Sequence, residues 1–156
     1  MEFKNFTEII DFAIEKEKEA AEFYLSISKL EQFSGKKEML EEFSAQEFKH
    51  QKLLKDLKSG KPGKELVDYT FKWIKDIKRS DYYAVEIKIR PGMPYHELLM
   101  LAMKREEKAL KLYNELLAKA ETAGQKKVFK MLCQEEAKHK LSLETIYDEY
   151  MAEMGD

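Results

Sequence analysis

Apolar residues recur at steps of three and four over four long stretches of the chain. This spacing keeps one face of an α-helix apolar, so it predicts four amphipathic helices. We expect them over residues 6–33, 36–58, 94–122 and 125–151. The residues predicted to face inward are, in chain order, Ile10, Ala13, Glu17, Ala20, Tyr24, Ile27; Leu40, Phe43, Glu47, His50, Leu54, Leu57; Leu99, Ala102, Glu106, Ala109, Tyr113, Leu116, Ala120; and Phe129, Leu132, Glu136, His139, Leu143, Ile146, Tyr150.

Glycine and proline mark the predicted helix ends. Gly35 and Gly124 break the chain within each helix pair, and Pro94 suits the first turn of the third helix. Asn5 with Glu8 resembles a capping pair at the start of the first helix.

The predicted fold class is all-α. Short breaks make each helix pair an antiparallel hairpin, and a long crossover joins the two hairpins, as in ferritin-like four-helix bundles. We predict a single ferritin-like domain over 1–156, with hairpins at about 6–58 and 94–151 and the crossover at about 59–93. The crossover is aromatic, with an expected short helix at 67–77 and a strand-like stretch at 83–89. Its aromatic residues suit packing, and an exposed part would suit a dimer surface.

The two predicted hairpins repeat each other after a shift of 89 residues. Glu17 maps to Glu106, Glu47 to Glu136, and His50 to His139. The repeat predicts near-twofold internal symmetry. At about 1.5 Å per residue, the first Glu and the Glu-x-x-His pair of each hairpin lie at a similar height above the turn. These six side chains should therefore come together.

These six residues lie within the apolar stripes, where a buried unpaired carboxylate costs several kcal/mol or takes up a proton. No lysine or arginine occupies a stripe position. Two divalent ions would balance four carboxylates beside neutral histidines, which favours a dinuclear site. Carboxylates with imidazoles and no thiolates suit iron or manganese, with iron the preferred assignment.

One Glu from each of two helices and Glu-x-x-His from each of two others is the pattern of ferritin-like dimetal carboxylate proteins. The chain resembles the rubrerythrin branch of these proteins across all four helices. It carries Glu17-x-x-Ala20-x-x-x-Tyr24 with Glu47-x-x-His50, and the same motifs at 106–113 and 136–139.

The resemblance implies a role for each residue. Glu47 and Glu136 would bridge two metal ions, and Glu17 and Glu106 would be terminal ligands. His50 and His139 would each bind one ion. Tyr24 and Tyr113 would lie beside the site and hydrogen-bond ligand carboxylates, although both also suit the core as simple aromatics.

Two departures from the family pattern affect function. Rubrerythrins carry a rubredoxin-like domain with four cysteines, whereas this chain has one cysteine, Cys133. Turnover would therefore need an external electron donor, such as a rubredoxin-like protein. Ala109 stands where rubrerythrins carry an additional Glu, and Glu107 points about 100° away from Glu106. Whether Ala109 permits rubrerythrin-type peroxidase activity is left open by the resemblance.

Composition excludes several classes of protein. Charged residues make up 37% of the chain, yet the net charge is only -2, which favours neither a nucleic-acid partner nor a basic membrane patch. No stretch is apolar enough for a membrane span, and the N-terminus does not read as a signal peptide, so we expect a cytoplasmic protein. One cysteine permits no disulfide framework, and Cys133 is expected as a small buried residue. His96 is expected to be exposed or capping. A homodimer or higher homo-oligomer is expected.

The favoured function is a diiron oxidoreductase that reduces peroxide or O2 as Fe(II) is oxidised. Two alternatives remain open at this point. One is an iron-binding or iron-handling protein without turnover, and the other is a helical interaction module with a vestigial site.

Overall fold

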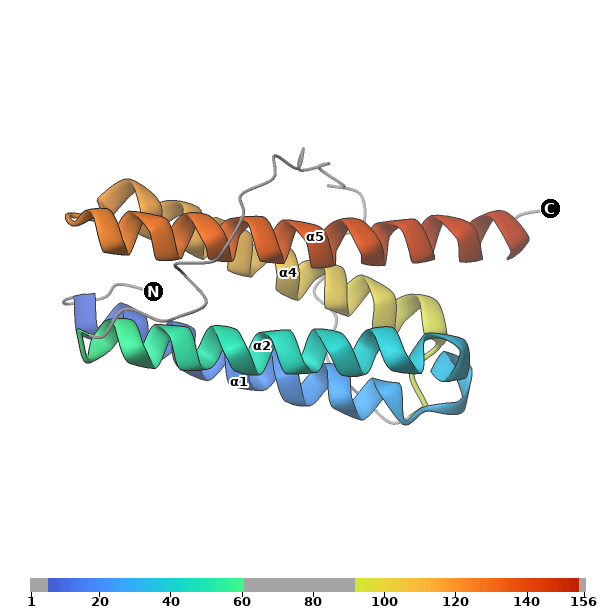
Figure 1. Ribbon diagram of the computed structural model, residues 1–156. Coiled ribbons are helices and arrows are strands. Elements are labelled where there is room, and N and C mark those ends of the chain that lie inside the picture. The colour runs from blue at the N-terminus through green and yellow to red at the C-terminus, as the bar shows by residue number, and fades with distance from the viewer. Residues whose placement is uncertain (1–5, 61–91, 155–156) are drawn as a thin grey trace. The chain divides into compact units, whose positions relative to one another are not determined.

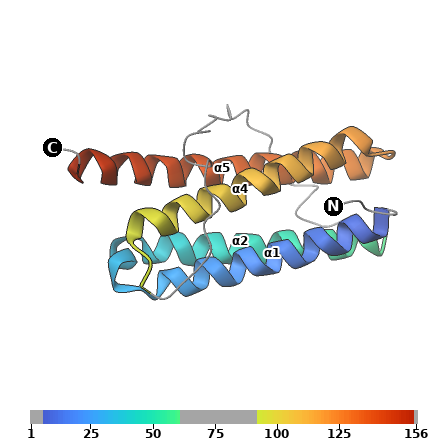
Figure 2. The ribbon, with the colours of Figure 1, turned by 180° about the vertical axis from the view of Figure 1, so that it is seen from behind.

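Four long α-helices and one short 3₁₀ helix make up the described part of the computed structural model, residues 6–60 and 92–154. Figures 1 and 2 show them from opposite sides. Their bounds are α1 Phe6–Ser28, η1 Glu31–Lys36, α2 Lys37–Lys58, α4 Tyr95–Lys119 and α5 Ala123–Met154. These ranges contain no strand, which confirms the predicted all-α fold class. Asn5 and the predicted crossover elements at 67–77 and 83–89 lie outside the described residues.

The chain divides into two compact units. One contains α1, η1 and α2, together with the segment Thr122–Val128, which includes the start of α5. The other contains α4 and the rest of α5. We call α1 with α2 the first hairpin, and α4 with α5 the second hairpin.

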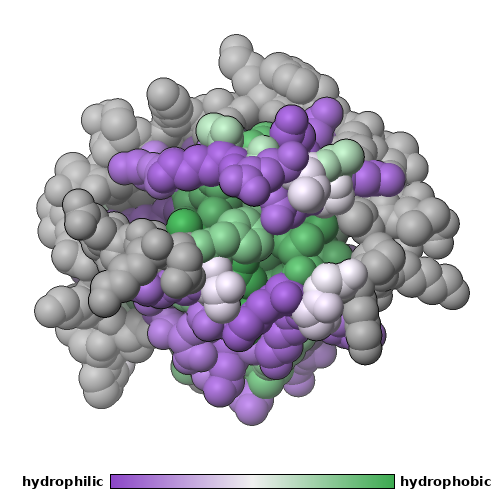
Figure 3. Space-filling model, turned by 90° about the vertical axis from the view of Figure 1, so that its left-hand side faces the viewer, coloured by the Kyte–Doolittle hydropathy of each residue, from purple (hydrophilic) through white to green (hydrophobic). Residues whose placement is uncertain are grey.

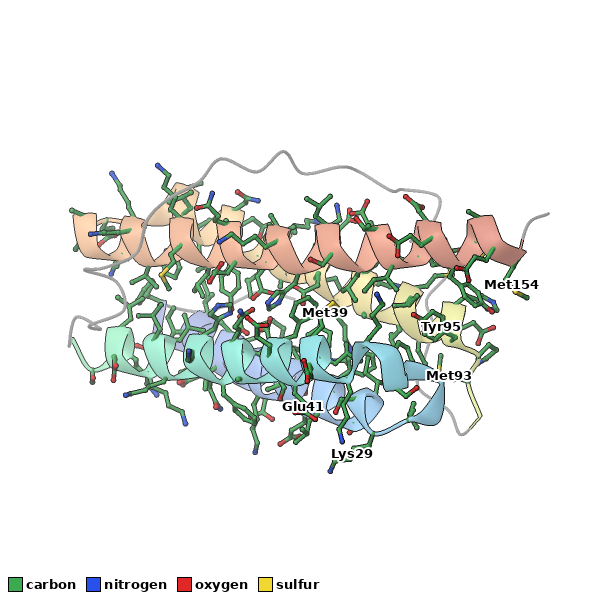
Figure 4. All side chains as sticks on the ribbon, turned by 45° about the vertical axis from the view of Figure 1, so that its right-hand side comes forward. Lys29, Met39, Glu41, Met93, Tyr95 and Met154 are labelled. Carbon is green, nitrogen blue, oxygen red and sulfur yellow. The ribbon has the colours of Figure 1, made fainter. Side chains whose placement is uncertain are left out.

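The two helices of the first hairpin run antiparallel along each other (Figures 1 and 2). The hydroxyl of Ser44 on α2 donates a hydrogen bond of 2.7 Å to the carbonyl oxygen of Ala21 on α1. One turn further on, the ring of Tyr24 packs edge-on against Phe43, with centroids 5.4 Å apart. Residue numbers of the contacting pairs thus increase along α1 and decrease along α2, as expected for antiparallel helices. The exposed side chain of Glu41 points away from this hairpin (Figure 4).

The second hairpin shows the same antiparallel register. At its open end the rings of Tyr95 on α4 and Tyr150 on α5 lie 4.9 Å apart. Nearer the connection, Cys133 Sγ lies 3.6 Å from Asn114 Oδ1. α5 then continues to Met154, an exposed residue at the end of the helix (Figure 4).

The connection in the first hairpin differs from the prediction. α1 ends at Ser28 instead of residue 33, and Gly35 lies inside η1. The hydroxyl of Ser28 donates to the carbonyl oxygen of Leu25 at 2.6 Å, a local bond that competes with continued helix. The 3₁₀ turn that follows buries Phe33 almost completely, so burial of one aromatic residue accompanies the early end of the helix.

The start of α5 also differs from the prediction. The Gln125 amide donates to Thr122 Oγ1 at 3.1 Å, and the Thr122 amide donates to Gln125 Oε1 at 3.4 Å. This reciprocal pair is a capping box, so α5 begins at Ala123 and includes Gly124. Gly124 is therefore not the helix break, and Pro94 is the N-cap of α4 instead of its first helical residue.

The predicted inward stripes form the core. Of their residues, only Ala20, Leu57, Ala109, Ala120 and Tyr150 are half-buried, and all the others are buried. Hydrophilic residues of the described ranges cover much of the face seen in Figure 3. Among residues 6–60 and 92–154, none of the helices combines the length and the hydropathy that a membrane span requires.

Candidate metal centre

The first hairpin brings three predicted ligands together. Glu17 projects from α1, and Glu47 and His50 lie one turn apart on one face of α2. His50 Nδ1 lies 3.6 Å from Glu17 Oε2 and 3.7 Å from Glu47 Oε2. One ligand atom from each residue lies within 4.8 Å of the other two. We call this group the first triad.

The second hairpin repeats the arrangement. Glu106 projects from α4, and Glu136 and His139 lie one turn apart on α5. His139 Nδ1 lies 3.5 Å from Glu106 Oε1, and one ligand atom from each of the three residues lies within 4.8 Å of the other two. This group is the second triad.

All six side chains are buried, with at most 3% of their surface exposed. Among the described residues the buried charged groups also include Glu144 and Lys140. Counted with ionised carboxylates, one ammonium and neutral histidines, these groups sum to four net negative charges in the interior. Such an excess is unfavourable away from water unless cations offset it. Two divalent cations would balance the four charges.

The spacing of the donors matches ligands of a common ion. Two donor atoms about 2.0–2.2 Å from one ion, at 90–120° to each other, lie about 3–3.8 Å apart. The histidine-to-carboxylate separations in both triads, 3.5–3.7 Å, fall in this range. Carboxylate oxygens with one imidazole and no thiolate suit iron or manganese. The residues present therefore fit a metal centre.

Comparison with protein families agrees with this reading. The family model described as Rubrerythrin matches residues 8–147, which include both triads. The chain belongs to the rubrerythrin family. This is a ferritin-like diiron family, so the predicted resemblance and fold class are confirmed. Neither the curated proteins nor the solved structures gave a match.

The two tyrosines of the rubrerythrin-like motifs are core residues of their hairpins. Tyr24 and Tyr113 each retain only 1% of their surface exposed. The ring of Tyr24 is set by edge-on contacts with Phe43 and Phe23. Each tyrosine follows its hairpin's first Glu by seven residues, two helical turns, and therefore lies on the same face. The hydrogen bonds to ligand carboxylates that the family resemblance implies stay a prediction.

One charged cluster was not predicted from the sequence. Lys140 is fully buried, and its Nζ lies 3.5 Å from Oε1 of the buried Glu144 and 4.0 Å from Oε2 of Glu107. The signal for the first contact is the Lys–Glu spacing of four residues on α5. The second contact has no such signal, because Glu107 lies on α4, far from Lys140 in the sequence. We call these three residues the Lys140 cluster.

Cys133 and His96 lie outside both triads. Cys133 is half-buried instead of fully buried, and burial raises the pKa of its thiol to about 12, with the charge of Glu136 adding to the effect. His96 is half-buried and stacks on Tyr150, with ring centroids 6.3 Å apart. Neither residue belongs to a potential metal-binding group among the described residues.

Proposed function

We propose that this rubrerythrin-family protein is a diiron oxidoreductase that reduces hydrogen peroxide or O2 and receives its electrons from an external donor. The observation that carries the proposal is the pair of buried Glu/Glu/His triads, one in each hairpin. Two Fe(II) ions, when bound, supply one electron each to a two-electron oxidant.

The chain's own residues would act on these ions in three ways. The helices hold the carboxylates and imidazoles of each triad at fixed spacing, which favours binding without large rearrangement. Burial of every ligand excludes bulk water and strengthens the electrostatic interactions of the site. The carboxylate-rich donor set favours hard, higher-charge ions over copper or thiol-bound metals. In this proposal Glu47 and Glu136 would hold the ions together with the other Glu and the His of their own triads.

A second candidate function rests on one residue. Ala109, which is half-buried, occupies the place of the additional Glu that peroxidase-type rubrerythrins carry. A methyl group offers no oxygen to a metal ion, so a redox-linked change of ligand at this position is unavailable. This favours an iron-binding protein that oxidises its ions once without turnover as the alternative.

An anaerobic Fe(II) titration followed by a peroxide or O2 challenge tests the proposal. We expect two Fe(II) per chain and rapid, stoichiometric oxidation, observed by absorbance. With a chemical reductant supplied, an oxidoreductase continues to consume oxidant, whereas an iron-binding protein stops after one oxidation. Failure to bind iron or manganese would contradict both candidates.

A matched pair of variants on α2 controls for general effects of losing a carboxylate. Glu47→Gln removes a buried member of the first triad, and Glu41→Gln removes an exposed carboxylate from the same helix. We expect metal binding and oxidant consumption to be lost together in the first variant and retained in the second. Unchanged oxidant consumption by metal-free protein would rule out the proposed mechanism.

A further inference from the structure

The Lys140 cluster is placed beside the second triad in a regular way. On α4, Glu106 of the triad is followed by Glu107 of the cluster, and on α5, His139 is followed by Lys140. The Glu106–His139 contact at 3.5 Å and the Glu107–Lys140 contact at 4.0 Å therefore link the same two helices at one level. A buried ion pair adds little net free energy of folding. The effect of the Lys140 cluster is therefore expected in the charge that it holds beside the second triad.

The first hairpin carries different residues at the corresponding positions. In the 89-residue repeat, Lys18 corresponds to Glu107, Gln51 to Lys140, and Lys55 to Glu144. Lys18 and Lys55 are exposed and Gln51 is half-buried. Two lysines and an amide offer no carboxylate to one another, so this trio cannot reproduce the ion pairs of the Lys140 cluster.

The two triads thus have the same ligands in different electrostatic surroundings. The Lys140 cluster adds one net negative charge near the second triad, and its Lys140–Glu144 pair is screened little because it is buried. The corresponding residues of the first hairpin add two positive charges, which solvent screens because both lysines are exposed. The surroundings of the second triad therefore favour a divalent cation, whereas those of the first triad disfavour it.

We propose that the two triads bind metal unequally. The second triad, Glu106, Glu136 and His139, binds its cation first and more tightly. The Lys140 cluster causes this difference through the net negative charge that it holds beside the second triad. This inference rests on the proposed function, because it concerns the same two triads. It assigns Glu107, Lys140 and Glu144 a role in the order of metal loading.

A Co(II) titration, observed by visible absorption and by calorimetry under anaerobic conditions, tests the order of loading. We expect two resolved steps for the unaltered chain. His139→Gln should remove the tighter step, whereas His50→Gln should leave the tighter step intact and remove the weaker one. Calorimetry measures the affinity of each step separately. General damage to the fold would weaken both steps, whereas loss of one triad should remove only one.

Single substitutions at matched positions test the cluster itself. Glu107→Gln, on a partly exposed side chain, should weaken the first step about three- to tenfold, as expected for losing one partly screened charge near a divalent ion. Lys18→Gln, at the corresponding exposed position, should leave the first step unchanged. Circular dichroism of both variants checks that the helices are retained.

The outcomes separate this inference from the proposed function. Two Co(II) ions bound with equal affinity, or loss of the tighter step in His50→Gln instead of His139→Gln, would overturn the inference while leaving a dimetal protein. A Glu107→Gln chain that loads like the unaltered one would overturn the role of the cluster. A chain that binds neither Co(II) nor Fe(II) would overturn both the inference and the proposed function.

Discussion

The two hairpins carry the same ligands on different supports. Each places one Glu on its first helix and Glu-x-x-His on its second, and each buries a tyrosine two turns after the first Glu. Beside the ligands, however, the first hairpin has Lys18, Gln51 and Lys55, whereas the second has the Lys140 cluster. Under the proposals above, the shared candidate ligands would determine which ions bind, and the differing neighbours would determine how tightly each triad binds its ion.

Removal of metal should give the largest effect, and it bears on what the hairpins share. Each ion at a thousandfold excess over its Kd stabilises the folded chain by about 4 kcal/mol, or roughly 10 °C in Tm for a chain of this length. We expect a fall in Tm on chelation, measured by calorimetry. A Glu47→Gln/Glu136→Gln chain serves as the control and should not respond to chelator. An equal Tm for the metal-loaded and metal-free chains would contradict a cation-balanced interior.

The next largest effect is expected for substitution of Lys140, which should distinguish the second hairpin from the first. Lys140→Met leaves the buried Glu144 carboxylate without its contact at 3.5 Å, which should cost about 3–5 kcal/mol of unfolding free energy in urea titrations. Gln51→Met, at the corresponding half-buried position, should cost under about 1 kcal/mol. The double variant Lys140→Met/Glu144→Gln should regain most of the loss. A double variant no more stable than Lys140→Met would show that the two residues do not act as a pair.

Loss of one candidate ligand from each hairpin should have matching effects on activity. Glu47→Gln and Glu136→Gln should each lower the initial rate of peroxide or O2 consumption by the Fe(II)-loaded chain by at least about 100-fold. This is the upper end of what removing only a supporting partner of a ligand costs. Stopped-flow absorbance measures it. Full activity in either variant would show that its triad is not used in the reaction.

The smallest effect is expected at the contacts between helices. Ser44→Ala removes a buried hydrogen bond of 2.7 Å to Ala21 and should cost about 1 kcal/mol. The corresponding residue of the second hairpin is Cys133, whose 3.6 Å contact with Asn114 is weaker, so Cys133→Ala should cost less. Urea denaturation of both variants measures the difference. A larger cost for Cys133→Ala would reverse this ranking.

The sequence predicted the helices, and the proximity of the three candidate ligands within each hairpin, because both depend on periodicity. Steps of three and four residues place Glu17, Glu47 and His50 on inward faces regardless of the exact helix ends. Those ends depend on local bonds that periodicity does not report, such as the hydroxyl of Ser28. Thr122 and Gln125 have the spacing of a capping box in the sequence, but Gly124 between them is typical of a helix break, so the two signals conflict there.

The Lys140 cluster illustrates a different limit. A lysine beside a stripe is usually solvated, and its burial is decided by which groups the neighbouring helix presents. Glu107 on α4 lies 33 residues earlier in the chain, so only the packed hairpin brings its carboxylate to Lys140. The roles of the six ligands and the number of domains stay predictions.

The way each triad spans its hairpin has a consequence for the stability of the fold. Its carboxylates and imidazole come from both helices, so one bound ion would close a loop of about thirty residues between Glu17 and Glu47, and another would close the equivalent loop between Glu106 and Glu136. A bound ion is then a reversible cross-link that restricts the unfolded chain as a disulfide does. A chain with one cysteine would in this way gain two cross-links, which form when metal is bound and are lost when it is released.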